Sequence, residues 1–182
     1  MSTERRNKRY IKDITNIAIC ASIMVVSSWL TIPFYIPFTL QTLAILIITS
    51  VLTLKTAFLS ILLYILIGLA GIPVFSGFGA GLSAIAGPTG GFLLSFLMFP
   101  FIMKLFSYIH SKIFWLKVLS MSVCIAVCYI CGALWYAFIY GASNDPSIIG
   151  VLSVCVFPFI LPDAIKILLA AVISIRLEKL NL

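Results

Sequence analysis

Charged side chains are scarce in this sequence, and those that occur are clustered. Only 9% of the 182 residues are Asp, Glu, Lys or Arg, whereas soluble domains carry about 25%. No charge occurs in 14–54, 56–103 or 118–144. Together with 63% hydrophobic residues and a mean hydropathy of +1.22, this pattern excludes a soluble domain, a disordered chain and a free-standing nucleic-acid binder. It indicates an integral membrane protein that has lipid as its solvent.

Motifs for common catalytic and metal sites are also lacking. The sequence has no Walker loop, no Ser-His-Asp set and no paired acidic motif, and it has a single histidine. Cys124, Cys128 and Cys131 share one helical face and would be candidates for a thiolate metal site. No nearby His or carboxylate completes such a site, and free cysteines also pack as small apolar residues. We therefore expect no metal and no resident cofactor.

Breaks in the hydrophobic pattern predict an all-α fold in one membrane domain covering residues 1–182. The six expected spans follow a basic segment at 1–13 and lie at about 14–30, 39–54, 56–69, 92–109, 118–140 and 148–177. The boundary at Lys55 leaves an alternative, because 40–69 would also form one helix and give five spans.

The distribution of cations decides between five and six spans. With six spans and both termini in the cytoplasm, eleven of the twelve Lys and Arg face inward, and the outer loops keep only Asp145. Five spans would turn the C-terminal cations outward, against the positive-inside rule. We therefore predict a multi-pass protein of the cell membrane with N-in/C-in topology.

The twelfth cation is Lys166, which lies within the last predicted span one turn after Asp163. Ionisable residues inside a membrane are costly and mark functional sites, so this pair is the leading candidate for one. The alternative is an ion pair that only fixes helix packing. Pro162 suits the first position of a helix, which would place Asp163 in the first turn, where the helix dipole favours an anion.

A glycine-rich stretch between Ala70 and Gly91 is the second candidate region. Its seven glycines fall outside helix and strand patterns, and aromatic and aliphatic residues lie between them. Such backbone is tolerated at membrane depth only where it is buried in protein or lines a cavity. We expect it to form a packed cap over a site on the outer side, rather than a flexible linker.

Four segments of the sequence form a distinctive set: IPFTLQT at 36–42, GIPVFSG at 71–77, GPTGGF at 87–92 and PDAIK at 162–166. In this order they resemble the BioY family, the biotin-binding S components of energy-coupling factor (ECF) vitamin transporters. The resemblance implies a six-helix S-component fold with an outward-facing biotin site roofed by the glycine-rich loop. It also implies a partner module of one transmembrane T component and two ATPase subunits, which would hydrolyse ATP for uptake.

The resemblance further suggests roles for individual residues. Asp163 would accept from the ureido N–H groups of biotin, and Lys166 would serve the ureido oxygen or the tail carboxylate. Other expected substrate-binding residues are Gln41, Phe75, Gly87, Thr89, Gly91, Phe92 and Trp135. On the first helix, Ala18, Ala21 and Ser22 form a small-xxx-small pattern that suits either docking of a partner helix or packing within the chain.

Three other functions remain as alternatives at this point. The first is an intramembrane enzyme that uses Asp163 as acid/base with Lys166 as electrostatic helper, although no third catalytic group is evident. The second is a structural or channel subunit, which would not bind a small molecule saturably. The third is an S component for a different vitamin.

Overall fold

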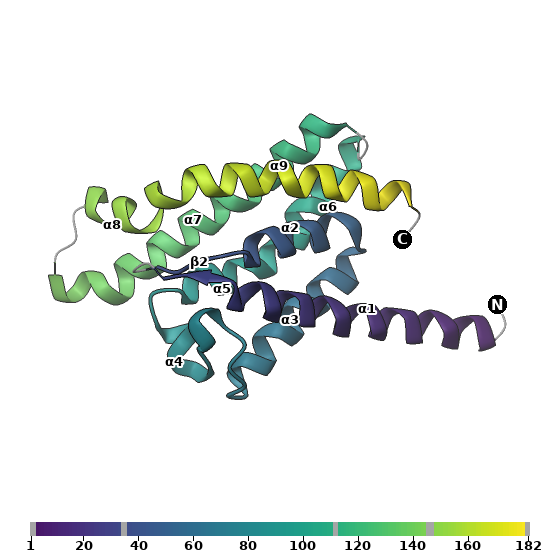
Figure 1. The fold of residues 1–182 in the computed structure, drawn as a ribbon, viewed down its shortest axis with the longest axis horizontal. Coiled ribbons are helices and arrows are strands. Elements are labelled where there is room, and N and C mark those ends of the chain that lie inside the picture. Colours follow the sequence, from purple (N-terminus) through teal and green to yellow (C-terminus); the bar gives the residue numbers. More distant parts are fainter. Residues whose placement is uncertain (1–2, 34–35, 111–112, 145–147, 181–182) are drawn as a thin grey trace.

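The computed structural model describes residues 3–33, 36–110, 113–144 and 148–180, and these are mostly helical (Figure 1). In chain order the elements are α1 (Thr3–Trp29), β1 (Thr31–Ile32), β2 (Phe38–Thr39), α2 (Gln41–Val51), α3 (Leu54–Leu69), η1 (Ser76–Phe78), α4 (Gly81–Ala86), α5 (Gly90–Ser95), η2 (Phe96–Met98), α6 (Phe99–His110), α7 (Phe114–Asn144), α8 (Ile148–Cys155) and α9 (Phe157–Lys179).

The helix boundary near Lys55 confirms that 40–69 is two helices. Leu52 takes an extended conformation after α2, and Thr53 caps α3 by accepting a hydrogen bond from the Thr56 backbone N–H at 3.4 Å. A threonine at this position satisfies one of the unpaired N–H groups at the start of a helix. Lys55 therefore lies in the first turn of α3 and is exposed.

Between α1 and α2 the chain forms a short hairpin. β1 and β2 pair antiparallel, with Thr31 opposite Thr39 and Ile32 opposite Phe38. Pro33 and Pro37 lie in the connection, which agrees with the expectation that this segment is not helical. The hairpin brings the Thr39 carbonyl to the start of α2, close to α9.

Within the described residues, four helical stretches are long and apolar enough to cross a membrane: Tyr10–Trp29, Gly90–Ser107, Phe114–Ile139 and Ile148–Lys179. The helices α2 and α3 are apolar but shorter. The basic segment at 1–13 is helical from Thr3 and continuous with the first apolar stretch, because α1 begins there. Asp145, assigned to an outer loop, lies outside the described residues.

The last helical stretch corrects one expectation. The chain kinks at Val156 and α9 begins at Phe157, so Pro158 rather than Pro162 occupies the first turn. Pro162 lies within α9, and Asp163 follows it beyond the first turn. The helix dipole therefore does not stabilise Asp163 as expected, because its effect is confined to the terminal turn. Side-chain partners of Asp163 must supply the compensation.

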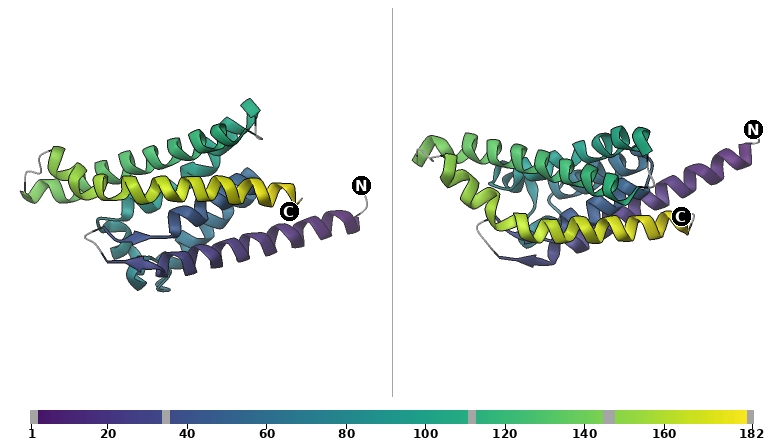
Figure 2. Two further views of the ribbon diagram at one scale, coloured as in Figure 1. Left: turned by 45° about the horizontal axis from the view of Figure 1, so that its top comes forward. Right: turned by 90° about the horizontal axis from the view of Figure 1, so that it is seen from above.

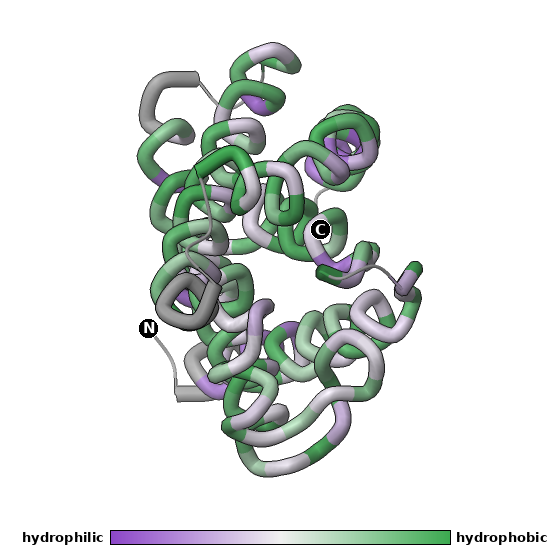
Figure 3. Tube along the Cα trace, turned by 90° about the vertical axis from the view of Figure 1, so that its left-hand side faces the viewer, coloured by the Kyte–Doolittle hydropathy of each residue, from purple (hydrophilic) through white to green (hydrophobic). Residues whose placement is uncertain are grey.

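The helices pack lengthwise. Figure 1 places the start of α1 and the end of α9 at one end of the bundle and places the hairpin, α4 and α8 at the other. Contacts join α1 to α3, α2 to α9 and α5 to α7, and α7 also runs beside α9 (Figure 2). Hydrophobic residues predominate along the helices (Figure 3), and many large ones are exposed, as lipid-facing surfaces require.

Candidate ligand-binding site

A cavity of about 90 Å³ lies where α2, α5, α7 and α9 meet the hairpin and the glycine-rich segment. Its lining combines a polar group on α2 and α9 with aromatic and aliphatic walls. The residues that line it are Ile36, Pro37, Thr39, Gln41, Thr42, Phe75, Ser76, Ala84, Thr89, Phe92, Leu93, Phe96, Cys128, Tyr129, Phe159, Asp163 and Lys166. Concave, mostly apolar sites with a few convergent polar groups are typical of small-molecule binding.

The polar group is centred on Asp163 and Lys166 of α9, which are 4% and 5% exposed. Lys166 Nζ lies 2.9 Å from Asp163 Oδ1. The same ammonium donates to the Thr39 carbonyl at 2.7 Å and to Thr42 Oγ1 at 2.9 Å, and it lies 3.9 Å from the centroid of the Phe38 ring. All three N–H bonds of this ammonium therefore have acceptors, and an aromatic face adds a cation–π contact.

Asp163 is also bonded at both oxygens. Oδ2 accepts from the Tyr129 hydroxyl at 2.7 Å, and Oδ1 accepts from Lys166 and, at 3.5 Å, from Thr42. These bonds link α2, α7 and α9 in one neutral network at the wall of the cavity. A network that is satisfied in this way is tolerated in an apolar interior, whereas an unpaired charge is not.

A second polar chain anchors the glycine-rich segment. Gln41 Nε2 donates to the Tyr64 hydroxyl at 3.0 Å, and Tyr64 donates to the Val74 carbonyl at 3.0 Å. Ser28 of α1 donates to the same carbonyl at 2.5 Å. Helices α1, α2 and α3 thus hold the backbone immediately before Phe75, which is 2% exposed and lines the cavity.

The glycine-rich segment is a packed structure, as expected, but it is partly helical. Gly71 and Gly77 have positive φ and allow tight turns that few other residues adopt. In contrast to the prediction that all seven glycines lie outside helices, Gly81 begins α4, and Gly90 and Gly91 begin α5. Close helix packing, shown below, explains why glycine occurs in α5.

The nine residues expected to bind substrate divide into two groups. Gln41, Phe75, Thr89, Phe92, Asp163 and Lys166 line the cavity. Gly87, Gly91 and Trp135 lie outside the set of lining residues. Trp135 Nε1 donates to the Gly87 carbonyl at 3.1 Å, and a Cβ at Gly91 would lie only 2.3 Å from the Trp135 Cβ. These three residues join α5 and the preceding turn to α7, behind the cavity.

Sequence reasoning missed several residues of the polar network. Thr42 stands next to Gln41, and Tyr129 lies on α7 in a uniformly apolar run that gives no signal of its own. Thr39 contributes its backbone carbonyl, which no side-chain pattern reveals. One general indication of them is present in the sequence, because an ammonium inside a membrane, such as that of Lys166, needs neighbouring groups that accept its hydrogen bonds.

On α1, the three small residues also divide. Ala21 is 3% exposed and belongs to the internal core, where α1 packs on α3. Ala18 and Ser22 are exposed, and Ser22 Oγ donates to the Ala18 carbonyl at 2.9 Å. Internal packing therefore accounts for Ala21, while Ala18 and Ser22 present a small-residue surface on the outside of the bundle.

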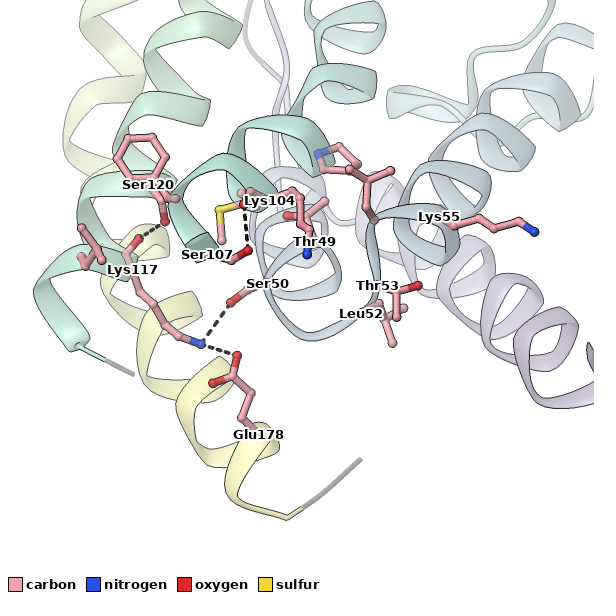
Figure 4. A pocket seen from close by; sticks show the side chains of 15 residues that line it. Thr49, Ser50, Leu52, Thr53, Lys55, Lys104, Ser107, Lys117, Ser120 and Glu178 are labelled. Carbon is pink, nitrogen blue, oxygen red and sulfur yellow. Dashed lines mark hydrogen bonds and ion pairs between the residues drawn. The ribbon is translucent and has the colours of Figure 1, made fainter. Parts of the chain in front are cut away.

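A larger cavity of about 540 Å³ lies at the opposite end, between the α2–α3 junction, α6, α7 and the end of α9 (Figure 4). At its edge Lys117 Nζ is 2.5 Å from Glu178 Oε1 and donates to Ser50 Oγ at 3.4 Å. Lys117 was expected in a loop before the fifth span, yet α7 begins at Phe114 and Lys117 is 6% exposed. This ion pair ties α2, α7 and α9 together far from Asp163.

The cysteines on α7 are packed rather than grouped around a metal. Cys124 and Cys128 are buried in the core, and Cys128 also contributes to the cavity lining. Within the part of the chain that the structure describes, no three His, Cys, Asp or Glu side chains are placed to hold a metal ion.

Comparison with known families gives the context of this site. The model of the BioY family matches residues 1–181. The chain belongs to the BioY family. "Probable biotin transporter BioY" of Pyrococcus horikoshii is 38% identical over 143 residues, which cover 79% of this chain and 81% of the relative. "Biotin transporter BioY" of Thermotoga maritima is 31% identical over 172 residues, covering 94% and 98%.

The fold also has a close structural counterpart. A crystal structure described as "the S-component for biotin from an ECF-type ABC transporter" superposes with a TM-score of 0.83 at 24% identity, covering 98% of this chain and 95% of that chain. The chain thus has the fold of that S component. The family and the apolar helices identify a prokaryotic membrane protein of a transporter family, not an enzyme.

Proposed function

We propose that this chain is a biotin-binding S component of an ECF-type uptake transporter and that biotin occupies the cavity beside Asp163 and Lys166. One observation carries the assignment. In a chain of the BioY family, a buried and fully hydrogen-bonded ion pair forms the polar wall of a cavity whose other walls are largely aromatic and aliphatic. A buried ion pair adds little to helix packing, because desolvation of the two charges offsets their attraction. It suits recognition of a polar ligand in a membrane.

The chemistry of biotin matches this wall. Its ureido group offers two N–H donors, for which the Asp163 carboxylate is a complementary acceptor. The thioether ring and the aliphatic tail are apolar and fit against Phe75, Phe92 and Phe159, which line the cavity. Gln41 and Thr89 lie in the same lining and are neutral groups for the remaining polar atoms.

Binding at this wall requires an exchange of partners, because the network is already closed. Tyr129 of α7 donates to Asp163 Oδ2 through a phenol that lines the cavity and is only partly buried. In the proposed complex a ureido N–H takes the place of the Tyr129 hydroxyl at Asp163 Oδ2. Lys166 then keeps its three acceptors and the pair stays neutral.

Titration calorimetry on the purified chain in detergent tests this assignment. Biotin should bind saturably without ATP, and riboflavin, thiamine and pentanoic acid should not bind. Binding of a different vitamin in place of biotin would support the alternative of an S component with another specificity. Absence of saturable binding by any of them would favour a structural or channel subunit and would overturn the proposal.

The proposed topology has six spans, with both termini in the cytoplasm. It is supported by the start of α1 and the end of α9, which lie at the same end of the bundle as the cavity bordered by Lys55, Lys104 and Lys117 (Figures 1 and 4). The positive-inside rule assigns this end to the cytoplasm. Single cysteines placed at Thr53 and at Ser83, in a background without other accessible thiols, test the orientation. Impermeant maleimide should label Ser83→Cys and not Thr53→Cys in intact cells, and the reverse result would contradict it.

For energy, the proposed partners are a transmembrane T component and two ATPases. This part rests on the resemblance, on the absence of a Walker loop in the sequence and on the exposed Ala18 and Ser22 of α1. Close approach of a partner helix requires small side chains. Ala18→Leu should therefore reduce biotin uptake by cells that express the whole transporter while leaving the biotin affinity of the isolated chain unchanged. Ile23→Leu, a conservative change at an exposed position of the same helix, is the matched control. Equal uptake by both variants would exclude docking at Ala18.

A further inference from the structure

Two phenyl rings that line the ligand cavity, those of Phe75 and Phe92, each pack against a glycine that does not itself line the cavity. The tip of the Phe75 ring points at Gly68 of α3, and a Cβ built on Gly68 would lie 2.1 Å from Phe75 Cζ. The tip of the Phe92 ring points at Gly132 of α7, and a Cβ there would lie 2.3 Å from Phe92 Cζ. Both glycines are buried inside helices.

These distances fix what a larger residue would do. Ordinary van der Waals contacts lie at 3.4–4 Å, so an added methyl group would force each ring to retreat by about 1 Å. The obstructing atoms are the far ends of side chains, which can turn without moving a helix. Since protein packs around Phe75, which is 2% exposed and has Tyr64 at 5.5 Å between ring centroids, the open direction is the cavity.

A neighbouring glycine shows that this arrangement is distinct from helix packing alone. A Cβ at Gly90 would lie 1.7 Å from the Ile85 carbonyl oxygen, which is backbone. Substitution there must move the main chain of α5 or of the preceding turn. Gly68 and Gly132 face ring edges instead, so their effect is transmitted to the cavity wall rather than to the fold.

We propose that Gly68 and Gly132 are specificity-determining residues, which set the width of the ligand cavity by holding the Phe75 and Phe92 rings away from its centre. The inference rests on the proposed binding of biotin in this cavity. The fused bicyclic ring of biotin is the broadest part of the molecule, so the position of the two phenyl rings governs whether it enters. The pair acts as two positioning residues on opposite helices, each through one aromatic ring.

The test uses the full chain with Gly68→Ala and Gly132→Ala, measured by calorimetry with biotin and with desthiobiotin, which lacks the thioether ring. Alanine favours a helix more than glycine does, so we expect thermal stability to be maintained. Biotin affinity should fall at least tenfold, and desthiobiotin affinity should fall less. Wild-type affinity for biotin in both variants would overturn the proposal.

Shortening the displaced ring provides the matched control. Gly132→Ala combined with Phe92→Leu, and Gly68→Ala combined with Phe75→Leu, should regain biotin affinity relative to the alanine variants, because leucine leaves room for the methyl group. A double variant whose biotin affinity is as low as that of its single variant overturns the proposal that the methyl group acts by displacing the phenyl ring. Failure of both the single and the double variant to fold would show that the glycine serves helix packing, and this also overturns it.

A crystal structure of Gly132→Ala separates this inference from the proposed function. If the wild-type chain does not bind biotin, the proposed function fails, and the seating of the ring is still decided by the coordinates. A Phe92 ring displaced into the cavity with α5 and α7 in place supports the inference. An unmoved ring with the two helices spread apart contradicts it.

Discussion

Replacing Asp163 by Asn is the most informative single perturbation of this protein. The change keeps the size of the side chain and removes its charge. Lys166 then retains only neutral acceptors, the Thr39 carbonyl and Thr42 Oγ1, and the face of the Phe38 ring. Its ammonium is left without a counter-charge at a position where the residue is 5% exposed.

The magnitude follows from the burial of both partners. Removing one member of a buried ion pair typically costs about 3–5 kcal/mol, because it leaves an uncompensated charge. If the pair forms the ligand wall, most of this cost appears as lost affinity, and about 3 kcal/mol corresponds to roughly two orders of magnitude in Kd. If the pair only fixes α9 against α2, the loss appears in thermal stability, and the folded fraction binds biotin normally.

Combining Asp163→Asn with Lys166→Met separates the two outcomes. This double variant removes the unpaired charge, so thermal stability should return towards that of the wild type, since apolar replacements of buried pairs are often neutral or stabilising. Calorimetric affinity for biotin should not return with it. A double variant with wild-type affinity would refute the reasoning and would move the site to the segment between Phe75 and Phe92.

Three further perturbations separate the parts of the site. Tyr129→Phe removes a hydrogen bond that the ligand is proposed to replace, so thermal melting should show a loss of about 1–3 kcal/mol, while calorimetry should show biotin affinity that is not weakened. Trp135→Phe removes one of two hydrogen bonds to the Gly87 carbonyl, which still accepts from the Gly90 N–H at 3.1 Å, and should cost about 1 kcal/mol of stability with unchanged biotin affinity. A large loss of affinity would instead place Trp135 over the ligand. Lys117→Met leaves Glu178 without its ion-pair partner, but that side chain is 35% exposed. The free energy of unfolding should therefore fall by less than about 3 kcal/mol, and biotin affinity measured by titration should be unchanged.

Hydrophobic runs and charge clusters predicted much of the fold. Breaks at Pro33 and Pro37 and near Lys55 separate helices in the structure, because proline lacks the N–H that a helix needs and Thr53 caps the start of a new helix. The predicted start of the last helix was wrong, because Pro158 and Pro162 are both compatible with the first turn of a helix. Only tertiary packing selects Pro158 over Pro162 for that position.

Within the site, charge was a better guide than side-chain type. Asp163 and Lys166 were predicted because charge inside a membrane demands compensation, and they form the polar wall. Trp135 was expected to bind substrate, and this stays a prediction; in the structure it packs against Gly87 and Gly91, outside the set of residues that line the cavity. Whether an aromatic residue faces a cavity or a glycine depends on helix rotation, which a uniformly apolar sequence such as α7 does not encode.

The closed network sets a constraint on how tightly and how selectively the site can bind. Since all N–H groups of Lys166 and both oxygens of Asp163 already have protein partners, a ligand gains little by merely supplying hydrogen bonds. Its gain comes from restoring the neutral network after displacing one partner and from burying apolar surface against the phenyl rings, at roughly 25 cal/mol per Å². A ligand that has only the hydrogen-bonding group or only the apolar surface does not offset the free energy lost when a protein partner is displaced. Selectivity therefore requires a ureido-like group and a ring of suitable width in the same molecule, held at the distance that separates Asp163 from Phe75 and Phe92.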